Sequence, residues 1–316
     1  METSLKPKWA GEDWLSQWVN RLIATQPLYA LMKQQARQVL IKTAEKKGVP
    51  WRQSYEQLSQ STVRTLLPHL ENSQIDYPDY YLKPFHAYDA GNLCWQAAFE
   101  AESATYAMAL RIWPQEDLTW QAAQQRLRDS FHQCLHKFGP SQVEQILDLG
   151  CSVGLSTRSL HQFYQQRQGG GVTTRGLDLS PYMLAVAQHQ DQHHEIADWI
   201  HAQAEQSGLA DQSIDVVTLQ FVLHELPQQA ARDIFQEAYR ILRPGGCLAI
   251  VDNDPQSPVI QGLPPVLFTL MKSTEPWSDE YYTFEVEAAL AAAGFEQISK
   301  TASDPRHRTL IGLRGS

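Results

Sequence analysis

Hydrophobic positions in the first 140 residues recur at helical spacing. Trp14, Trp18 and Leu22 follow one another at i, i+4 and i+8, which places them on one face of a helix. Similar spacing predicts helices over 14–23, 26–47, 54–67, 93–112 and 117–138. Gly139-Pro140 ends the last of them. We therefore expect a helical N-terminal region.

After residue 140 the pattern changes to short apolar runs separated by helical segments. The runs over 146–149, 173–178, 214–220 and 247–252 predict buried strands. An Ala-rich helix over 284–293 and two short strands near Gln297 and Leu310 complete the pattern. Strands that alternate with helices favour the α/β class, with a parallel sheet covered on both sides.

A glycine-rich turn follows the first strand, in Ile146-Leu-Asp-Leu-Gly-Cys-Ser-Val-Gly-Leu-Ser-Thr157. A strand, a tight turn and a helix in that order bring the backbone against a nucleoside-bearing ligand. The second strand ends in Asp178, a little over about 20 residues later, the length of one βαβ crossover. Its carboxylate can accept hydrogen bonds from both ribose hydroxyls. A dinucleotide-binding enzyme would use the same two features.

The turn resembles motif I of the class I S-adenosylmethionine (SAM) methyltransferases, which reads roughly D-x-G-x-G-x-G. Asp148, Gly150 and Gly154 match it, and Ser152 stands at the middle glycine. Leu-His-Glu-Leu at 223–226 and Leu-Arg-Pro-Gly-Gly at 242–246 are similar to later motifs of the ubiquinone/menaquinone-type enzymes. An NAD oxidoreductase is disfavoured, because the late Leu-Arg-Pro-Gly-Gly and the two terminal strands have no place there. The resemblance covers 143–313 and implies a doubly wound, seven-stranded, mostly parallel Rossmann-like sheet.

The same resemblance assigns the cofactor contacts. It implies that Gly150, Ser152 and Gly154 follow the amino-acid moiety of SAM, and that Asp148 supports the turn and the ammonium group. It places Asp178 on the ribose. The other implied contacts are Leu179 and Met183 on the adenine faces, Gln203 and Ala204 at the adenine edge, and Gln220 beside the methionine part. Gln203 replaces an Asp of the family, but its amide oxygen can also accept the adenine amino group.

Methyl transfer from a sulfonium needs mainly alignment, because the leaving group is already activated. A base is required only if the acceptor has a proton to lose. His224 and Asp252 follow strand ends at the edge where α/β sites form, and are candidate catalytic residues. His224 can act as a general base, orient substrate or cap a loop. His86 is a third candidate, if its segment folds over the site.

Other polar residues are given structural roles at this stage. We expect Glu225 to face solvent or a helix end. The histidines at 189, 193, 194 and 201 lack a pattern of acidic partners and are expected at the surface. The four cysteines are not paired at metal-ligand spacing, so we expect neither a disulfide framework nor a metal site.

Composition narrows the possible partners. The net charge is −9, and the region after residue 140 has 11 Lys+Arg against 21 Asp+Glu. An acidic catalytic region argues against nucleic acid and anionic lipid as partners. No apolar stretch reaches the roughly 18 residues that a membrane span needs, and the start has no apolar signal core. We therefore expect a cytoplasmic protein.

The N-terminal region is distinct in composition, with seven of the nine tryptophans. Its segment 75–92 is broken by Pro78 and Pro84 and is rich in tyrosine. The segment is either a packed bridge between helices or a cover over the cofactor site. Residues 77–101 also resemble uncharacterised cyanobacterial and chloroplast methyltransferase-like proteins, a likeness that names no substrate.

The prediction is thus a helical lid or substrate region over 1–140 and a SAM-binding domain over 141–316. The predicted function is SAM-dependent methyl transfer to O, N or C of a small molecule. Two alternatives remain: a protein methyltransferase that docks its partner on the N-terminal region, and a SAM-binding protein without catalysis. The sequence determines neither the acceptor nor the oligomeric state.

Overall fold

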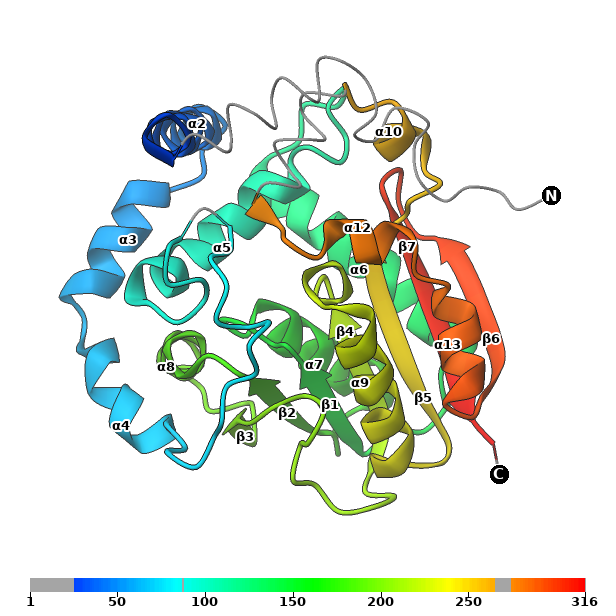
Figure 1. Ribbon diagram of the computed structural model, residues 1–316. Coiled ribbons are helices and arrows are strands. Elements are labelled where there is room, and N and C mark those ends of the chain that lie inside the picture. The colour runs from blue at the N-terminus through cyan, green and yellow to red at the C-terminus, as the bar shows by residue number, and fades with distance from the viewer. Residues whose placement is uncertain (1–25, 87, 265–273, 316) are drawn as a thin grey trace.

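The computed structural model describes residues 26–86, 88–264 and 274–315, and shows one sheet between helices (Figure 1). The predicted helix over 14–23 lies outside the described residues. The strands run in the order β3-β2-β1-β4-β5-β7-β6, with β7 antiparallel to both neighbours and the other pairs parallel. The predicted α/β class, with a doubly wound, seven-stranded, mostly parallel sheet, is confirmed.

The strands and helices of this sheet region alternate along the chain. The strands are β1 (Gln145–Leu149), β2 (Thr173–Asp178), β3 (Asp198–His201), β4 (Ile214–Gln220), β5 (Leu242–Asn253), β6 (Phe295–Ala302) and β7 (His307–Arg314). The helices are α7 (Leu155–Gln168), α8 (Pro181–Gln190), η2 (Leu223–Glu225), α9 (Gln228–Ile241), α10 (Pro258–Gln261), α12 (Ser278–Tyr282) and α13 (Val286–Ala292).

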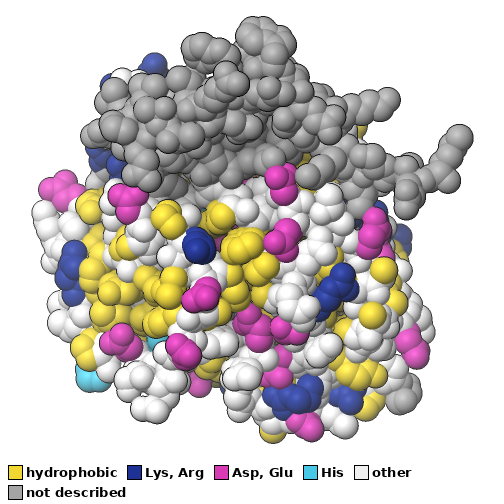
Figure 2. Space-filling view, viewed as in Figure 1, with side chains coloured by type: hydrophobic (Ala, Val, Ile, Leu, Met, Phe, Trp, Pro, Cys, Tyr) yellow, Lys and Arg dark blue, Asp and Glu magenta, His cyan; other side chains and the backbone are white. Residues whose placement is uncertain are grey.

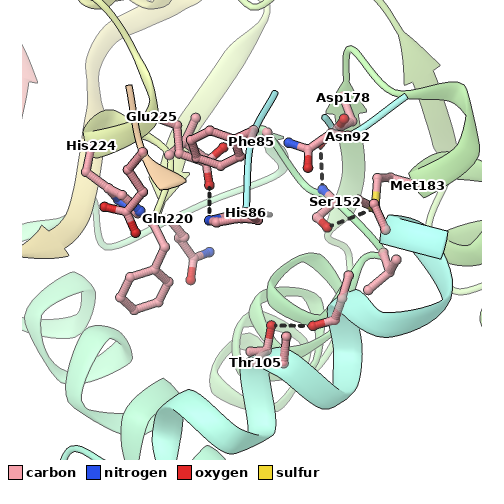
Figure 3. A pocket seen from close by; sticks show the side chains of 18 of the residues that line it. Phe85, His86, Asn92, Thr105, Ser152, Asp178, Met183, Gln220, His224 and Glu225 are labelled. Atoms are coloured by element: carbon pink, nitrogen blue, oxygen red, sulfur yellow. Dashed lines mark hydrogen bonds and ion pairs between the residues drawn. The ribbon is translucent and has the colours of Figure 1, made fainter. Parts of the chain in front are cut away.

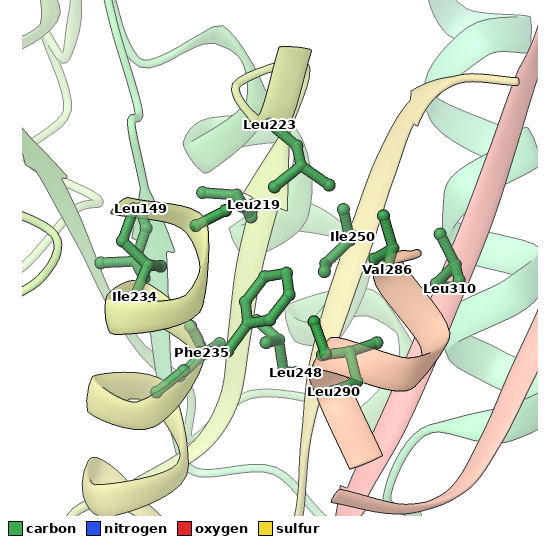
Figure 4. Packing of buried hydrophobic residues seen from close by; sticks show 14 of the residues in the cluster. Leu149, Leu219, Leu223, Ile234, Phe235, Leu248, Ile250, Val286, Leu290 and Leu310 are labelled. Carbon is green, nitrogen blue, oxygen red and sulfur yellow. The ribbon is translucent and has the colours of Figure 1, made fainter. Parts of the chain in front are cut away.

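Alternation along each strand divides the core between the two faces of the sheet. On one face Leu149 and Leu248 pack with Phe235 of α9 and Leu290 of α13 (Figure 4). On the other face the neighbouring strand positions, such as Ile146, join a second cluster with α7. Side chains on a strand point alternately to opposite faces, so these apolar runs require cover on both sides.

Helix α6 (Trp120–Phe138) provides part of that second cover. The Thr119 hydroxyl begins the helix by accepting the Ala122 amide at 3.2 Å. Phe131 and Leu135 are buried in the same cluster as Ile146. A division of the chain at residue 140 remains a prediction, and α6 shares its core with the sheet.

The remaining N-terminal elements form an outer layer beside α8 (Figure 1). They are α2 (Gln26–Lys46), α3 (Trp51–Gln60), η1 (Thr62–Leu66), α4 (Leu67–Leu70) and α5 (Trp95–Ala109). Phe99 of α5 and Val63 of η1 are buried with Met183 of α8. Arg37 of α2 forms an ion pair with Glu100, whose side chain is only 2% exposed. This ion pair links α2 to α5.

The surface in the same view is uneven in character. Hydrophobic side chains gather on the side where the N-terminal helices lie, and charged side chains are scattered over the rest (Figure 2). No helix within the described ranges is both long and apolar enough to cross a membrane.

Candidate active site

A cavity of about 750 Å³ lies where the parallel strands end, between the sheet and the N-terminal helices. The strand order reverses between β1 and β4, and ligands of such sheets bind in the crevice at that point. Most predicted site residues line the cavity, namely His86, Gly150, Ser152, Asp178, Leu179, Met183, Ala204, Gln220 and His224. Asp148, Gly154, Gln203 and Asp252 are not part of its lining.

The turn after β1 has a backbone that favours glycine at several positions. Gly150 has φ +66°, and a Cβ atom there would lie 2.6 Å from the Val222 side chain. Ser152 adopts φ +48°, a left-handed conformation that strains residues with a side chain. Its amide donates to Asp178 Oδ2 at 2.7 Å, which stabilises the turn (Figure 3).

Two motif residues support the turn from behind. A Cβ atom on Gly154 would lie 2.4 Å from Trp199, so this glycine allows helix α7 to approach β3. Asp148 is fully buried and accepts hydrogen bonds from the Ser156 and Thr157 hydroxyls at 2.7 and 2.8 Å. Both residues therefore shape the turn from positions outside the cavity wall.

Asp178 ends β2 at the cavity wall. Its carboxylate accepts the amides of Ser152 at 2.7 Å and Ser180 at 2.8 Å. Burial raises the pKa of Asp178 to about 6, although the backbone donors oppose the shift. The carboxylate is therefore fixed in place by the glycine-rich turn and by the start of α8.

The end of β3 is covered by the N-terminal region. His201 was expected at the surface, but it is buried and accepts the Asn72 amide on Nδ1 at 2.8 Å. That expectation was wrong because the segment after α4 covers this strand end. Gln203 donates its amide to the Asp76 carbonyl at 2.6 Å, whereas the next residue, Ala204, lines the cavity.

At the opposite end of the cavity, His224 is paired with Asp252. Its Nδ1 lies 2.8 Å from the Asp252 carboxylate, which also accepts the His224 amide at 3.1 Å. Burial lowers the pKa of His224, but the buried carboxylate outweighs this and raises it to about 10. A protonated imidazole has no lone pair to accept a proton. In this state His224 forms an ion pair with Asp252 and cannot act as a general base.

His86 and Glu225 lie beside this pair (Figure 3). His86 donates its amide to the Thr274 carbonyl at 3.1 Å, and its Nε2 is 3.7 Å from Glu225 Oε1. Burial lowers the pKa of His86 and raises that of Glu225 to about 8. Glu225, which was expected to face solvent or a helix end, is the last residue of η2 and lines the cavity. In the sequence, only its position next to His224 indicated that Glu225 could lie in the site.

Sequence reasoning also missed two guanidinium groups in the lining, those of Arg111 and Arg306. Arg306 donates to the Asn253 side chain at 2.9 Å. Burial and the charge of Arg306 lower the pKa of Arg111. In the described part of the chain, neither guanidinium forms an ion pair. No motif marks these arginines, because Arg111 lies in the turn after α5 and Arg306 in the turn before β7.

Comparison with known proteins agrees with the fold and the motif order. A family model described as a methyltransferase domain matches residues 147–250. An uncharacterised methyltransferase of Synechocystis is 29% identical over 174 residues, which are 54% of this chain and 76% of that protein. Residues 147–250 therefore match a methyltransferase domain, in agreement with the class I SAM-dependent methyltransferase motifs. SAM is the cofactor that these motifs imply.

The chain is also similar to a second sequence relative and to a solved structure. A demethylmenaquinone methyltransferase of Chlorobaculum parvum is 32% identical over 142 residues. The match spans 42% of this chain and 56% of that relative. A putative O-methyltransferase structure from Nostoc punctiforme aligns with a TM-score of 0.51 and 18% identity. It covers 79% of this methyltransferase and 67% of the Nostoc chain, a likeness that shows the fold.

Proposed function

We propose that this enzyme transfers the methyl group of SAM to a small molecule bound inside the cavity. The observation that carries the proposal is one cavity with two chemically different ends. Asp178, Ser152 and Met183 lie at one end, and His86 and His224 at the other (Figure 3). Its volume of about 750 Å³ falls within the roughly 300–1,000 Å³ of small-molecule sites.

The cofactor would occupy the first end. We assign the ribose to Asp178, because the backbone donors hold its carboxylate in a fixed position. Leu179, Met183 and Ala204 would border the adenine. Gln220 would contact the methionine part, and its side chain is held by Arg128 Nη1 at 3.1 Å and by Asp148 at 3.3 Å. The methyl group would then be directed toward the histidine end.

The acceptor would occupy the second end and carry an anionic group. Arg111 and Arg306 supply positive charge there without carboxylate partners of their own in the described structure. Guanidinium groups in such positions recognise carboxylate or phosphate. Tyr81 and Phe85, which also line the cavity, would pack on the apolar part of the acceptor.

Calorimetry with S-adenosylhomocysteine tests cofactor binding in the full-length protein. Replacing Asp178 with Ala should weaken binding by about 1–3 kcal/mol, because a charged hydrogen-bond acceptor is lost. Asp191→Ala is the matched control, since Asp191 is buried and accepts two amides outside the cavity. The proposal fails if the wild-type protein binds NADH and gives no heat with S-adenosylhomocysteine.

Incubation of a cell extract with methyl-labelled SAM tests the acceptor class. Label should enter the small-molecule fraction, and a fraction that binds anion-exchange resin should contain it. Arg306→Met should raise the KM for that fraction more than it lowers kcat. Label that enters proteins instead would support docking of a protein substrate and contradict the small-molecule assignment.

A further inference from the structure

Three potential metal ligands from separate parts of the chain meet at the acceptor end of the cavity. His86 comes from the tyrosine-rich segment, His224 from η2, and Glu275 from the turn before α12. One ligand atom of each lies within 4.8 Å of the others. We propose that these three side chains bind a divalent transition-metal ion, a site that the sequence did not indicate. The role of the metal in catalysis rests on the proposed function, whereas its binding does not.

The donor set suits such an ion. Two imidazole nitrogens and one carboxylate are typical ligands of zinc, iron, manganese and cobalt. Ligand bonds of about 2.0–2.2 Å place neighbouring ligands roughly 3.4 Å apart in a tetrahedral site. The separations of up to 4.8 Å therefore require a contraction of at most about 1.4 Å on binding.

Asp252 prepares His224 for this role. It holds Nδ1 of His224 at 2.8 Å, which leaves Nε2 for a metal that displaces the Nε2 proton on binding. The carboxylate is itself held by the amides of His224 at 3.1 Å and Asn253 at 2.6 Å. A carboxylate that orients a ligating histidine is a recurrent outer-shell arrangement in metal sites.

His86 and Glu275 are held close together by the backbone. The His86 amide donates to the carbonyl of Thr274, the residue before Glu275, at 3.1 Å. Glu275 Oε2 also accepts the Ser278 hydroxyl at 3.2 Å. Glu225 Oε1 lies 3.7 Å from His86 Nε2, next to the three ligands. The carboxylates of Asp252 and Glu275 lie beside the two imidazoles and would attract a cation, against the positive charge of nearby Arg306.

The site would bind the oxygen that receives the methyl group. A hydroxyl bound to the metal would lose its proton to solvent more easily than a free one. The resulting oxygen lone pair forms the new bond to the methyl carbon. The C–S bond breaks and its electron pair stays on sulfur, which gives S-adenosylhomocysteine and the methyl ether. A suitable acceptor is a hydroxyl compound with an anionic group that faces Arg111 and Arg306.

Cobalt binding tests the site without an activity assay. Full-length protein freed of metal by a chelator is titrated with Co²⁺, and visible absorption is recorded. We expect one Co²⁺ per chain with an absorption band from its d electrons. His86→Ala and His224→Ala should each weaken binding at least tenfold, and Asp252→Asn about 10–100-fold. His193→Ala, which removes an exposed histidine outside the cavity, should have no effect.

S-adenosylhomocysteine binding is measured on the same samples as a check of folding. His86→Ala alters an irregular segment and should keep normal affinity for this ligand, so it remains informative even if His224→Ala unfolds. Equal Co²⁺ affinity in wild-type and His86→Ala protein would overturn the proposal. Absence of wild-type binding below millimolar Co²⁺, with normal S-adenosylhomocysteine binding, would overturn the metal site and leave the proposed function intact.

Discussion

Ser152 and Asp178 at the strand ends both stabilise the turn after β1 and line the cavity. Ser152 lines the cavity and donates its amide to Asp178, although its φ of +48° favours glycine. The hydrogen bond offsets part of the strain that a left-handed residue costs. Asp178 in turn joins the glycine-rich turn to α8 through Ser180. A change at Asp178 should therefore affect both ligand binding and the turn.

Cofactor affinity should depend on pH through Asp178. Its pKa is raised from 3.8 to about 6, so the carboxylate becomes protonated as the pH falls below about 6. S-adenosylhomocysteine should bind more weakly from pH 7 to pH 5, because a neutral acid is a poorer acceptor of the ribose hydroxyls. Calorimetry across this range measures the trend, and Asp178→Asn should flatten it.

The same shift has the opposite effect on the free protein. Between about pH 4 and 6 the folded state retains a proton that the unfolded state has lost, so the contribution of Asp178 to stability falls as the pH rises.

Cofactor affinity that is constant from pH 5 to 7 in wild-type protein would show that Asp178 does not bind the ribose.

Gly154 should be sensitive to substitution because of packing. In Gly154→Ala the new methyl group meets Trp199 at 2.4 Å and Ala187 at 3.2 Å, in a left-handed backbone with φ +75°. We expect a loss of about 1–3 kcal/mol or more in the free energy of unfolding, measured by urea denaturation. Gly169→Ala is the matched control, since φ is +74° but nothing lies within 4 Å. Equal losses in the two variants would show that backbone strain alone matters.

At the scale of elements, the tyrosine-rich segment joins the two halves of the protein. The Tyr80 hydroxyl donates to Glu205 at 2.5 Å, and the Asn92 carbonyl accepts the Ser180 hydroxyl at 2.7 Å. Between these points Tyr81 and His86 line the cavity. The two interpretations left open by the sequence are thus compatible, because a packed bridge also supplies one wall of the cavity.

Tyr81→Ala should lower turnover far more than the melting temperature. Tyr81 lines the cavity, and its loss would admit water beside the sulfonium. Turnover is measured as label transferred to the small-molecule fraction, and melting by differential scanning fluorimetry. Tyr77→Ala is the matched control, since Tyr77 stacks on Tyr81 and contacts His201 but is absent from the lining. Normal activity per folded molecule in Tyr81→Ala would make the segment purely structural.

At the scale of the whole molecule, the N-terminal region and the sheet share their core. Leu135 of α6 is buried with Ile146 of β1, and Phe99 of α5 is buried with Met183 of α8. Shared clusters of this kind couple the unfolding of the parts that contribute to them. We therefore expect the chain to unfold in one cooperative transition.

Leu135→Ala tests this coupling. The change should cost about 2–5 kcal/mol and shift the whole transition in differential scanning calorimetry. Gln133→Ala, on the exposed side of the same helix, should shift it little. Two transitions, of which Leu135→Ala moves only one, would instead show that the N-terminal region folds as an independent domain.

The sequence by itself determined the sheet, the turn after β1 and the acid at the end of β2. These features depend on local alternation, on glycine conformation and on the length of one crossover, and all three are visible in a short window of residues. Most residues that the family motifs indicate therefore line the cavity.

Tertiary structure decided where the other side chains act. Gln203 bonds to Asp76 outside the lining, and Gly154 is required by Trp199, because each depends on a segment remote in sequence. The meeting of His86, His224 and Glu275 likewise depends on how the tyrosine-rich segment crosses the sheet edge. Long-range packing brings such groups together, and no local periodicity records which remote segment will cover a given strand end.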